Sequence, residues 1–338
     1  MKKYKIGVIG TGRIGKLHIE NLMRYIPEAE VYAAADVMIE HSKEWLEENN
    51  IEHVFSDYKD LLALEEIDAV VISTPTDTHA EISIAAAEAG KHVFCEKPVD
   101  LTVERVKDVI AAVKKADVVF QVGFNRRFDH NFRRVREHVV DGNIGDVHMV
   151  LVTSRDPAPP PVSYIESSGG LFLDMMIHDF DMVRYQSGAE VVAVTAHGAN
   201  LVDPEIGEAG DIDTAIVTLE LSNGALAMIN NSRQAVYGYD QRVEVFGSKG
   251  QATAYNDQPN NVELYTEEDI STDKIPYFFL DRYTNAFINQ FEDFIKALKG
   301  EIEVPVNDVD GLRAIEIALA CNESLKTGER VELVYDEL

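Results

Sequence analysis

Three glycines near the start of the chain restrict its fold more than any other feature. Gly10, Gly12 and Gly15 lie in the stretch YKIGVIGTGRIGKLHIENLMRY, which predicts a buried strand, a tight turn and a helix. In a G-x-G-x-x-G of this kind, the first glycine permits the turn and the second lets the backbone approach a phosphate group. The third glycine allows the helix to pack closely on the strand. The chain is therefore expected to begin with a nucleotide-binding βαβ unit.

Strand-like and helix-like segments alternate through the first third of the chain. Apolar segments such as EVYAAADV, IDAVVISTP, KHVFCE and VVFQVGF are separated by helical ones, which predicts a parallel sheet with helices on both faces. Later segments such as TAIVTLELSNGALAMINNSR and RVEVFGSKGQATAY predict antiparallel hairpins, followed by two helices (281–299 and 308–326). We predict an α/β protein with an N-terminal Rossmann domain (1–123). A C-terminal α+β domain with a large, mostly antiparallel open sheet follows (124–338).

Composition narrows the classes of partner. The chain of 338 residues has a formal net charge of −28, which disfavours nucleic acid and anionic membranes as partners. Two cysteines make no disulfide framework. There is no signal-peptide pattern and no apolar run long enough to span a bilayer, so a cytoplasmic protein is expected.

Polar residues at predicted strand ends indicate which dinucleotide binds. Asp36 follows the glycines by about 20 residues, where a carboxylate accepts a hydrogen bond from the adenosine ribose and repels a 2′-phosphate. NAD is therefore favoured over NADP. Strand carboxyl ends line the ligand crevice of such sheets. The remaining residues expected at the cofactor are Arg13, Ile14, Ser73, Thr74, Pro75, His79, Glu96 and Lys97. His79 and Lys97 have an alternative interpretation as surface residues.

The stretch GGLFLDMMIHDFDM (169–182) combines apolar residues with four ionisable ones. On a regular helix Asp174 and His178 lie one turn apart, and Asp181 falls near the same face, whereas Asp179 points away. A carboxylate one turn from an imidazole fixes its tautomer and stabilises its protonated form, as a general base requires. A solvent-facing Asp–His pair on an amphipathic helix is the alternative. Ligation of a metal by Asp174, His178 and Asp181 is disfavoured, because no further His or Cys cluster supports it. No metal is predicted.

The blocks GVIGTGRIGKLHIENL, STPTDTH, HVFCEKPV, GFNRRFD and SGGLFLDMMIHDFDMVRY occur in an order that resembles the glucose–fructose oxidoreductase / inositol dehydrogenase family. The resemblance covers essentially the whole chain. Within the family, SRDPAPPP and AVYGYDQRVEVFGSKG are similar to the inositol-oxidising branch. The resemblance implies NAD-dependent oxidation of myo-inositol to 2-keto-myo-inositol by a homotetramer. Another inositol isomer, sugar or polyol is the alternative substrate, and a non-enzymatic NAD-dependent sensor is a third possibility.

The resemblance also implies roles for individual residues. His178 corresponds to the general base, Asp174 to its paired carboxylate, and Lys97 to a lysine near nicotinamide and substrate. Asp179 corresponds to a substrate-contacting acid, which conflicts with its place on a regular helical wheel. The other residues expected at the substrate are Asn125, Arg127, Asp156, Tyr237 and Tyr283. The two tyrosines have an alternative role in the core or at an interface, and the proline-rich loop after Asp156 is alternatively a stiff connector.

Overall fold

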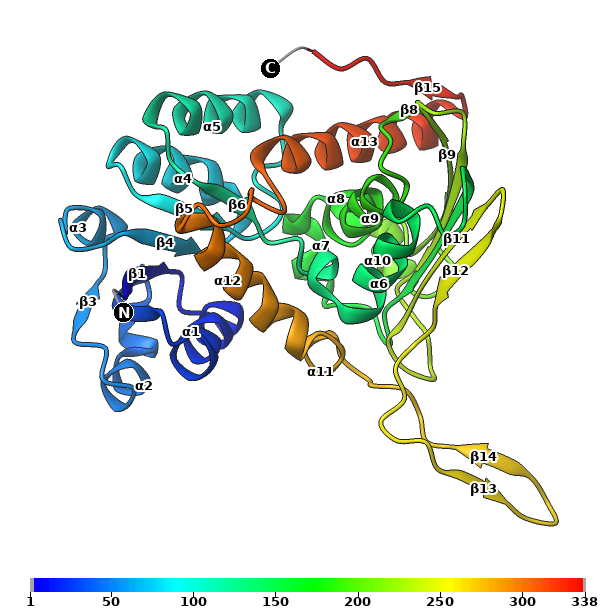
Figure 1. Ribbon diagram of the computed structural model, residues 1–338, viewed down its shortest axis with the longest axis horizontal. Helices are drawn as coiled ribbons and strands as arrows, with labels where there is room; N and C mark the ends of the chain where they lie inside the picture. The colour runs from blue at the N-terminus through cyan, green and yellow to red at the C-terminus, as the bar shows by residue number, and fades with distance from the viewer. Residues whose placement is uncertain (1–2, 337–338) are drawn as a thin grey trace. The chain divides into compact units, whose positions relative to one another are not determined.

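The protein divides into two compact units (Figure 1). The computed structural model describes residues 3–336, and all of their side chains except those of residues 166 and 167. Unit 1 contains the described residues up to Asn125 together with Asn285–Ile315, and unit 2 contains Arg126–Thr284 with the described residues from Glu316 on. The predicted boundary after residue 123 lies next to the end of the first stretch. Residues 285–315 belong to unit 1, whereas the prediction placed them in the second domain.

Unit 1 is built on a parallel sheet, as the alternating segments predicted. Its six strands have the order β3-β2-β1-β4-β5-β6, and every neighbouring pair is parallel. This is the order of a dinucleotide-binding sheet, whose crevice opens where the order reverses beside β1. The strands are β1 (Tyr4–Ile9), β2 (Ala29–Ala35), β3 (His53–Phe55), β4 (Ala69–Ile72), β5 (His92–Cys95) and β6 (Phe120–Val122).

The helices of unit 1 follow or cover these strands, and α13 is shared with unit 2. The helices are α1 (Arg13–Tyr25), η1 (Ile39–His41), α2 (Lys43–Glu48), α3 (Tyr58–Leu62), η2 (Thr76–Thr78), α4 (His79–Glu88), α5 (Val103–Ala116), α12 (Thr284–Leu298) and the first part of α13 (Asp308–Thr327). Helix α12 returns to unit 1 because its apolar face joins the first core. Phe291 and Phe294 pack in one buried cluster with Ile19 of α1 and Phe94 of β5. Burial of such aromatic side chains stabilises the fold by about 1.5–3 kcal/mol each, so this later segment is part of the first core.

Unit 2 is built on a seven-stranded sheet of order β12-β11-β7-β10-β9-β8-β15. The pair β7–β10 is parallel and the other pairs are antiparallel, which confirms the mostly antiparallel sheet. The predicted hairpins are β9–β10 and β11–β12. The strands are β7 (Val147–Arg155), β8 (Val191–Ala199), β9 (Thr214–Leu221), β10 (Leu226–Ser232), β11 (Asp240–Gly247), β12 (Gly250–Ala254) and β15 (Val331–Glu332). A separate hairpin consists of β13 (Glu263–Tyr265) and β14 (Ile270–Thr272).

Helices of unit 2 lie on one face of this sheet (Figure 1). They are α6 (His130–Val140), α7 (Val162–Ser168), α8 (Gly170–Asp174), α9 (Ile177–Ser187), α10 (Pro204–Glu208), α11 (Phe279–Arg282) and the last part of α13, and η3 (Asn125–Phe128) joins the units in sequence. Helix α6 was not predicted. Its start is fixed by Asp129, whose carboxylate accepts hydrogen bonds from the N–H groups of Asn131 and Phe132. None of the helices within residues 3–336 is both long and apolar enough to cross a bilayer.

The stretch that was predicted as one helix is two. Helix α8 ends at Asp174 and α9 begins at Ile177, with a turn at Met175 and Met176. The N–H of Met176 donates to the carbonyl oxygen of Leu171, five residues back. This wide turn adds a residue to the helical repeat. The regular wheel that placed Asp174 and His178 on one face, and Asp179 away from it, does not apply across the turn.

Candidate active site

The glycines of unit 1 form the turn that the sequence predicted. A Cβ on Gly10, which has a φ of +93°, would lie 2.6 Å from the backbone of Ser73, and one on Gly15 would lie 1.9 Å from the carbonyl oxygen of Gly10. A Cβ on Gly12 would meet nothing within 4 Å. Gly10 and Gly15 therefore permit close packing, whereas Gly12 leaves open space at the N-terminus of α1. Free N–H groups at a helix N-terminus favour a bound phosphate.

A hollow of about 400 Å³ adjoins this turn. The hollow is lined by Thr11, Gly12, Arg13, Lys16, Asp36, Met38, His41 and Ser42. Oδ2 of Asp36 accepts a 2.7 Å hydrogen bond from the N–H of Thr11, and Oδ1 accepts a 2.8 Å bond from the N–H of Met38. The carboxylate is thus held in one orientation at the end of β2, with lone pairs left for a ribose hydroxyl. These residues fit NAD, because a carboxylate at the end of β2 suits a ribose diol and disfavours a 2′-phosphate.

The loops after β4 and β5 are tied together by one imidazole. His79 is buried, and its Nδ1 lies 2.7 Å from the carbonyl oxygen of Pro98, while its Nε2 lies 2.8 Å from that of Thr74. The hydroxyl of Ser73 donates to the carbonyl oxygen of Gly10 at 2.9 Å. Ser73 and His79 therefore fix the crevice loops, while Thr74 is partly exposed and Pro75 exposed.

Lys97 is half-buried in the loop after β5, next to a carboxylate that packs against the core. Oε1 of Glu96 lies 2.7 Å from Nε2 of the buried His18, and Oε2 accepts a 3.3 Å hydrogen bond from the N–H of Lys97. A Cβ on Gly123 would lie 2.9 Å from Glu96. Both oxygens of the Glu96 carboxylate thus contact protein groups, and the hydrogen bond from the N–H of Lys97 orients the backbone of this lysine.

In unit 2, Asp174 and His178 differ from their neighbours in burial. Every other residue from Leu171 to Val183 is buried, whereas these two are partly exposed. Oδ1 of Asp174 accepts a 2.8 Å hydrogen bond from the hydroxyl of Tyr164, and Oδ2 lies 3.5 Å from Nη1 of Arg233. The carboxylate is held on both oxygens, and Asp174 and His178 are partly accessible within an otherwise buried segment.

Asp156 follows β7 close to the same charges. Burial and the nearby Asp174 carboxylate, opposed by Arg233 and Arg126, together raise the pKa of Asp156 to about 6. Its backbone N–H donates to the carbonyl oxygen of Ser232 at 3.0 Å.

Two predicted substrate residues form buried ion pairs. Asp179 is fully buried, where Oδ1 accepts a 2.5 Å hydrogen bond from Arg126 and Oδ2 accepts one of 2.9 Å from Asn231. Arg127 donates from Nε and Nη2 to the carboxylate of Asp181 at 2.6–3.1 Å. The structure thus gives the carboxylate of Asp179 and the guanidinium of Arg127 protein partners in the core of unit 2. Loss of one partner from such a buried pair costs about 3–5 kcal/mol.

The two predicted tyrosines and Asn125 lie in different surroundings. Tyr237 is 44% exposed, and its hydroxyl donates to Oδ2 of Asp240 at 2.6 Å. Tyr283 is 1% exposed, and its ring meets that of Tyr239 edge-on with centroids 5.8 Å apart. Asn125 is buried at the end of the first stretch of unit 1. The alternative role of Tyr283 as a core residue therefore has direct support.

Sequence reasoning missed Tyr164, Arg233, Arg126 and Asp211, all of which surround the predicted carboxylates. Arg126 stands beside the predicted Arg127 in GFNRRFD, which was the available signal. Tyr164 and Arg233 gave no local signal, because their partners are distant in the sequence.

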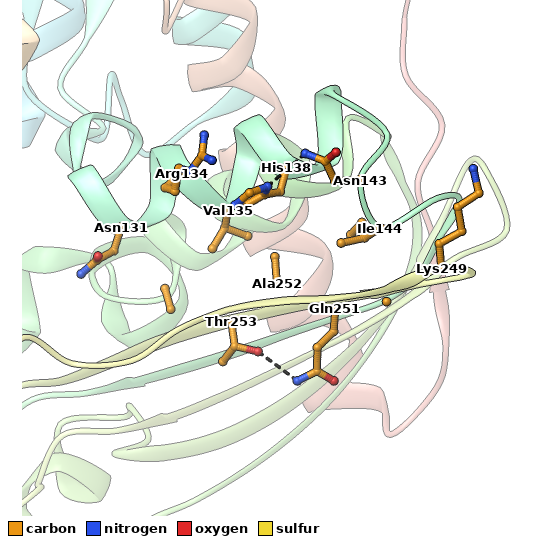
Figure 2. Close-up of a pocket in the computed structure, with 12 residues that line it drawn as sticks. Asn131, Arg134, Val135, His138, Asn143, Ile144, Lys249, Gln251, Ala252 and Thr253 are labelled. Carbon is orange, nitrogen blue, oxygen red and sulfur yellow. Dashed lines mark hydrogen bonds between the residues drawn. The ribbon is translucent and has the colours of Figure 1, made fainter.

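The described residues of unit 2 contain two further features with no assigned role. Asp129, His130 and Asp257 bring ligand atoms within 4.8 Å of one another, but Arg282 already forms ion pairs with both carboxylates. A hollow of about 470 Å³ lies between α6 and β12, where Arg134, His138 and Asn143 lie opposite Gln251 and Thr253 (Figure 2). Asp174, His178 and Asp181, the disfavoured metal set, do not form such a cluster.

The order of the parallel sheet and the cradle of unit 1 define a dinucleotide-binding protein, and unit 2 contributes the partly exposed Asp174 and His178. Residues 4–124 match the NAD-binding Rossmann fold of an oxidoreductase family, and residues 136–333 match the C-terminal alpha/beta domain of the same family. The chain belongs to this glucose–fructose oxidoreductase / inositol dehydrogenase family, which confirms the predicted resemblance.

Three relatives illustrate the similarity. The myo-inositol 2-dehydrogenase of Thermotoga maritima is 48% identical over 97% of this chain and 98% of its own length. A crystal structure of a probable dehydrogenase from Thermotoga maritima superposes with a TM-score of 0.95 at 48% identity, covering 97% of this chain and 98% of that one. The scyllo-inositol dehydrogenase of Lactobacillus casei with bound NAD(H) and scyllo-inositol has a TM-score of 0.92 at 33% identity, covering 98% and 99% of the two chains.

Proposed function

We propose that this protein is an NAD-dependent inositol dehydrogenase that oxidises myo-inositol to 2-keto-myo-inositol. The observation that carries the proposal is the partial exposure of Asp174 and His178 within an otherwise buried segment. A carboxylate and an imidazole that stay accessible where their neighbours are buried suit removal of a hydroxyl proton. Similarity over nearly the whole length to a myo-inositol 2-dehydrogenase gives the substrate class.

In this proposal His178 takes the proton from the reacting hydroxyl group. The carboxylate of Asp174 stabilises the imidazolium that forms, and Tyr164 keeps the carboxylate in place. The ammonium group of Lys97 favours the developing negative charge on the oxygen. When bound, NAD would supply the hydride acceptor, and the residues of the protein supply orientation and proton transfer.

A neutral polyol fits the charges of the proposed substrate residues. Asp156 and Asp174 accept hydrogen bonds from hydroxyl groups, and carboxylates disfavour an anionic substrate such as a hydroxy acid. Tyr237 and Asn125 remain proposed substrate contacts. For Asp179, Arg127 and Tyr283 we propose a supporting role, because their side chains are buried among protein partners.

An assay of NADH formation with separate inositols tests this function. Reduction of NAD with myo-inositol, and much slower reduction with scyllo-inositol and glucose, is expected. Faster turnover of scyllo-inositol would move the substrate to that isomer, which a relative of known structure binds. No reduction with any polyol, despite measurable binding of NAD, would favour the non-enzymatic sensor.

We also propose a homotetramer that assembles through the sheet face of unit 2 opposite its helices. Met149 of β7 aligns with Leu226 of β10 and with Phe246 of β11. All three are at least 37% exposed, and so is the neighbouring Met228. A contiguous apolar patch on a sheet marks an interaction surface. Light scattering after size exclusion should give four chains, and Leu226→Glu should lower that number. A monomeric wild type would contradict the proposal.

We further propose a cytoplasmic location. Cys95 and Cys321 are buried free thiols, and burial raises the pKa of Cys95 to about 12. Thiols of this kind suit a reducing compartment. Cell fractionation with an antibody against the native protein tests the location, and recovery from the medium or membranes would contradict it.

A further inference from the structure

A fully buried arginine lies behind the proposed catalytic carboxylate. Arg233 is 1% exposed at the end of β10. Its Nη1 lies 3.5 Å from Oδ2 of Asp174, and its Nη2 lies 3.6 Å from Oδ2 of Asp211. Its Nε and Nη2 donate no hydrogen bond to protein atoms within the described residues. The arginine therefore acts on both carboxylates through its charge.

The two carboxylates stand at opposite ends of α8. Oδ1 of Asp211 accepts a 3.0 Å hydrogen bond from the N–H of Leu171, in the first turn of the helix. A Cβ on Gly170, which has a φ of +83°, would lie 2.7 Å from the same oxygen, so Asp211 packs closely on the helix start. Asp174 is the last residue of α8. Arg233 thus links the start of this five-residue helix to its end.

We propose that Arg233 is a positioning residue, whose buried guanidinium fixes α8 and holds the Asp174 carboxylate in place opposite Tyr164. This inference rests on the proposed function, because it assigns Arg233 to the acid–base group of that reaction. Arg233 is buried, so it acts on the substrate only through Asp174.

The charge balance around Arg233 gives a reason for this role. Asp156, Asp174 and Asp211 place three carboxyl groups around one buried cation. The other ionisable groups around Asp156 and Asp174 are those of Arg126, Asp179, Tyr164 and Tyr239. His178 lies after the turn that follows α8. Without Arg233, the three carboxylates would repel one another with no buried cation between them, and Asp174 would lose the charge that holds its carboxylate in place.

Two substitutions, one that removes a positive charge and one that removes a negative charge, test the proposal. The measurement is the pH profile of kcat/KM for inositol. Arg233→Met removes a positive charge, so the acid limb should move up by about one pH unit or more. Asp211→Asn removes a negative charge and keeps an oxygen for Leu171, so the acid limb should move down. Arg233→Lys should restore most of the wild-type profile. NAD affinity should be unchanged in all three variants, because the cradle belongs to unit 1.

Arg134→Met is the matched control, since Arg134 is an exposed arginine of the same unit that pairs with Glu137 on α6. A purely structural role would lower activity at every pH without moving the limb, and that result would overturn the proposal. Shifts of Arg233→Met and Asp211→Asn in the same direction would overturn it too. If Arg233→Met does not fold, the downward shift in Asp211→Asn still decides. Absence of wild-type turnover with every inositol would instead refute the proposed function.

Discussion

The hydroxyl of Tyr164 donates a 2.8 Å hydrogen bond to Oδ1 of Asp174, the carboxylate oxygen opposite the one that faces Arg233. Burial, and the neighbouring Asp174 carboxylate, raise the pKa of Tyr164, so the phenol stays protonated as a donor. A short helix after the proline-rich loop, α7, thereby contacts Asp174 of the proposed catalytic residues.

Replacement of this phenol should weaken catalysis. Tyr164→Phe removes a hydrogen bond to a charged group, and we expect kcat/KM for inositol to fall about tenfold. Steady-state kinetics with NAD at saturation checks this, and Tyr255→Phe, at an exposed tyrosine of the same unit, is the control. Unchanged kcat/KM in Tyr164→Phe would show that the bond does not orient Asp174.

Loss of the proposed general base should affect turnover and leave the cofactor site intact. His178→Ala is expected to lower kcat by about 100-fold or more, because proton removal then falls to water. NAD affinity, measured by fluorescence titration, should remain at the wild-type value. His138→Ala serves as the control on α6. Near-normal turnover in His178→Ala would assign the proton to another group.

The carboxylate of Asp36 should set the choice of dinucleotide. Asp36→Asn removes the charge that repels a 2′-phosphate, while Arg13 and Lys16 of the same hollow remain. We expect the ratio of kcat/KM for NAD to that for NADP to fall about tenfold or more. Asp60→Asn, at an exposed position on α3, is the control. An unchanged ratio would mean that Asp36 does not meet the ribose.

The raised pKa of Asp156 makes folding stability depend on pH. Its carboxyl has a pKa of about 6 in the folded protein, above the ordinary value of 3.8, so the folded state binds the proton more tightly. This group therefore favours folding at low pH, and that contribution is lost as the pH rises from about 4 to 6. Asp156→Asn should raise the free energy of unfolding at pH 8 by up to about 2–3 kcal/mol, with little change at pH 4. Urea unfolding at both values measures it. A variant less stable than wild type at pH 8 would contradict the assignment.

The sequence could predict features whose causes are local. Gly10, Gly12 and Gly15 specify a turn by their own backbone freedom, and Asp36 lies at the end of the strand after them. The hairpins at SNG and GSKG also follow from short-range turn chemistry. These elements are correct because few other conformations suit their residues.

Features that depend on distant partners could not be predicted. The wide turn at Met175 and Met176 interrupts a sequence that is otherwise suitable for one helix, and only its packing determines the break. Asp179 pairs with Arg126 and Asn231, which come from other parts of unit 2. The return of α12 to the first core depends on a cluster shared with Phe94. Each of these requires a contact that sequence spacing does not encode.

The imidazole of His79 holds the carbonyl oxygens of Thr74 and Pro98, and so it joins the two loops that carry the cofactor and lysine residues. A loop graft intended to alter specificity cannot treat these segments as separate modules. A donor sequence for residues 73–78 has to bring a compatible partner at positions 79 and 98. Recombination between homologues is expected to succeed when residues 73–78, His79 and Pro98 all come from the same parent.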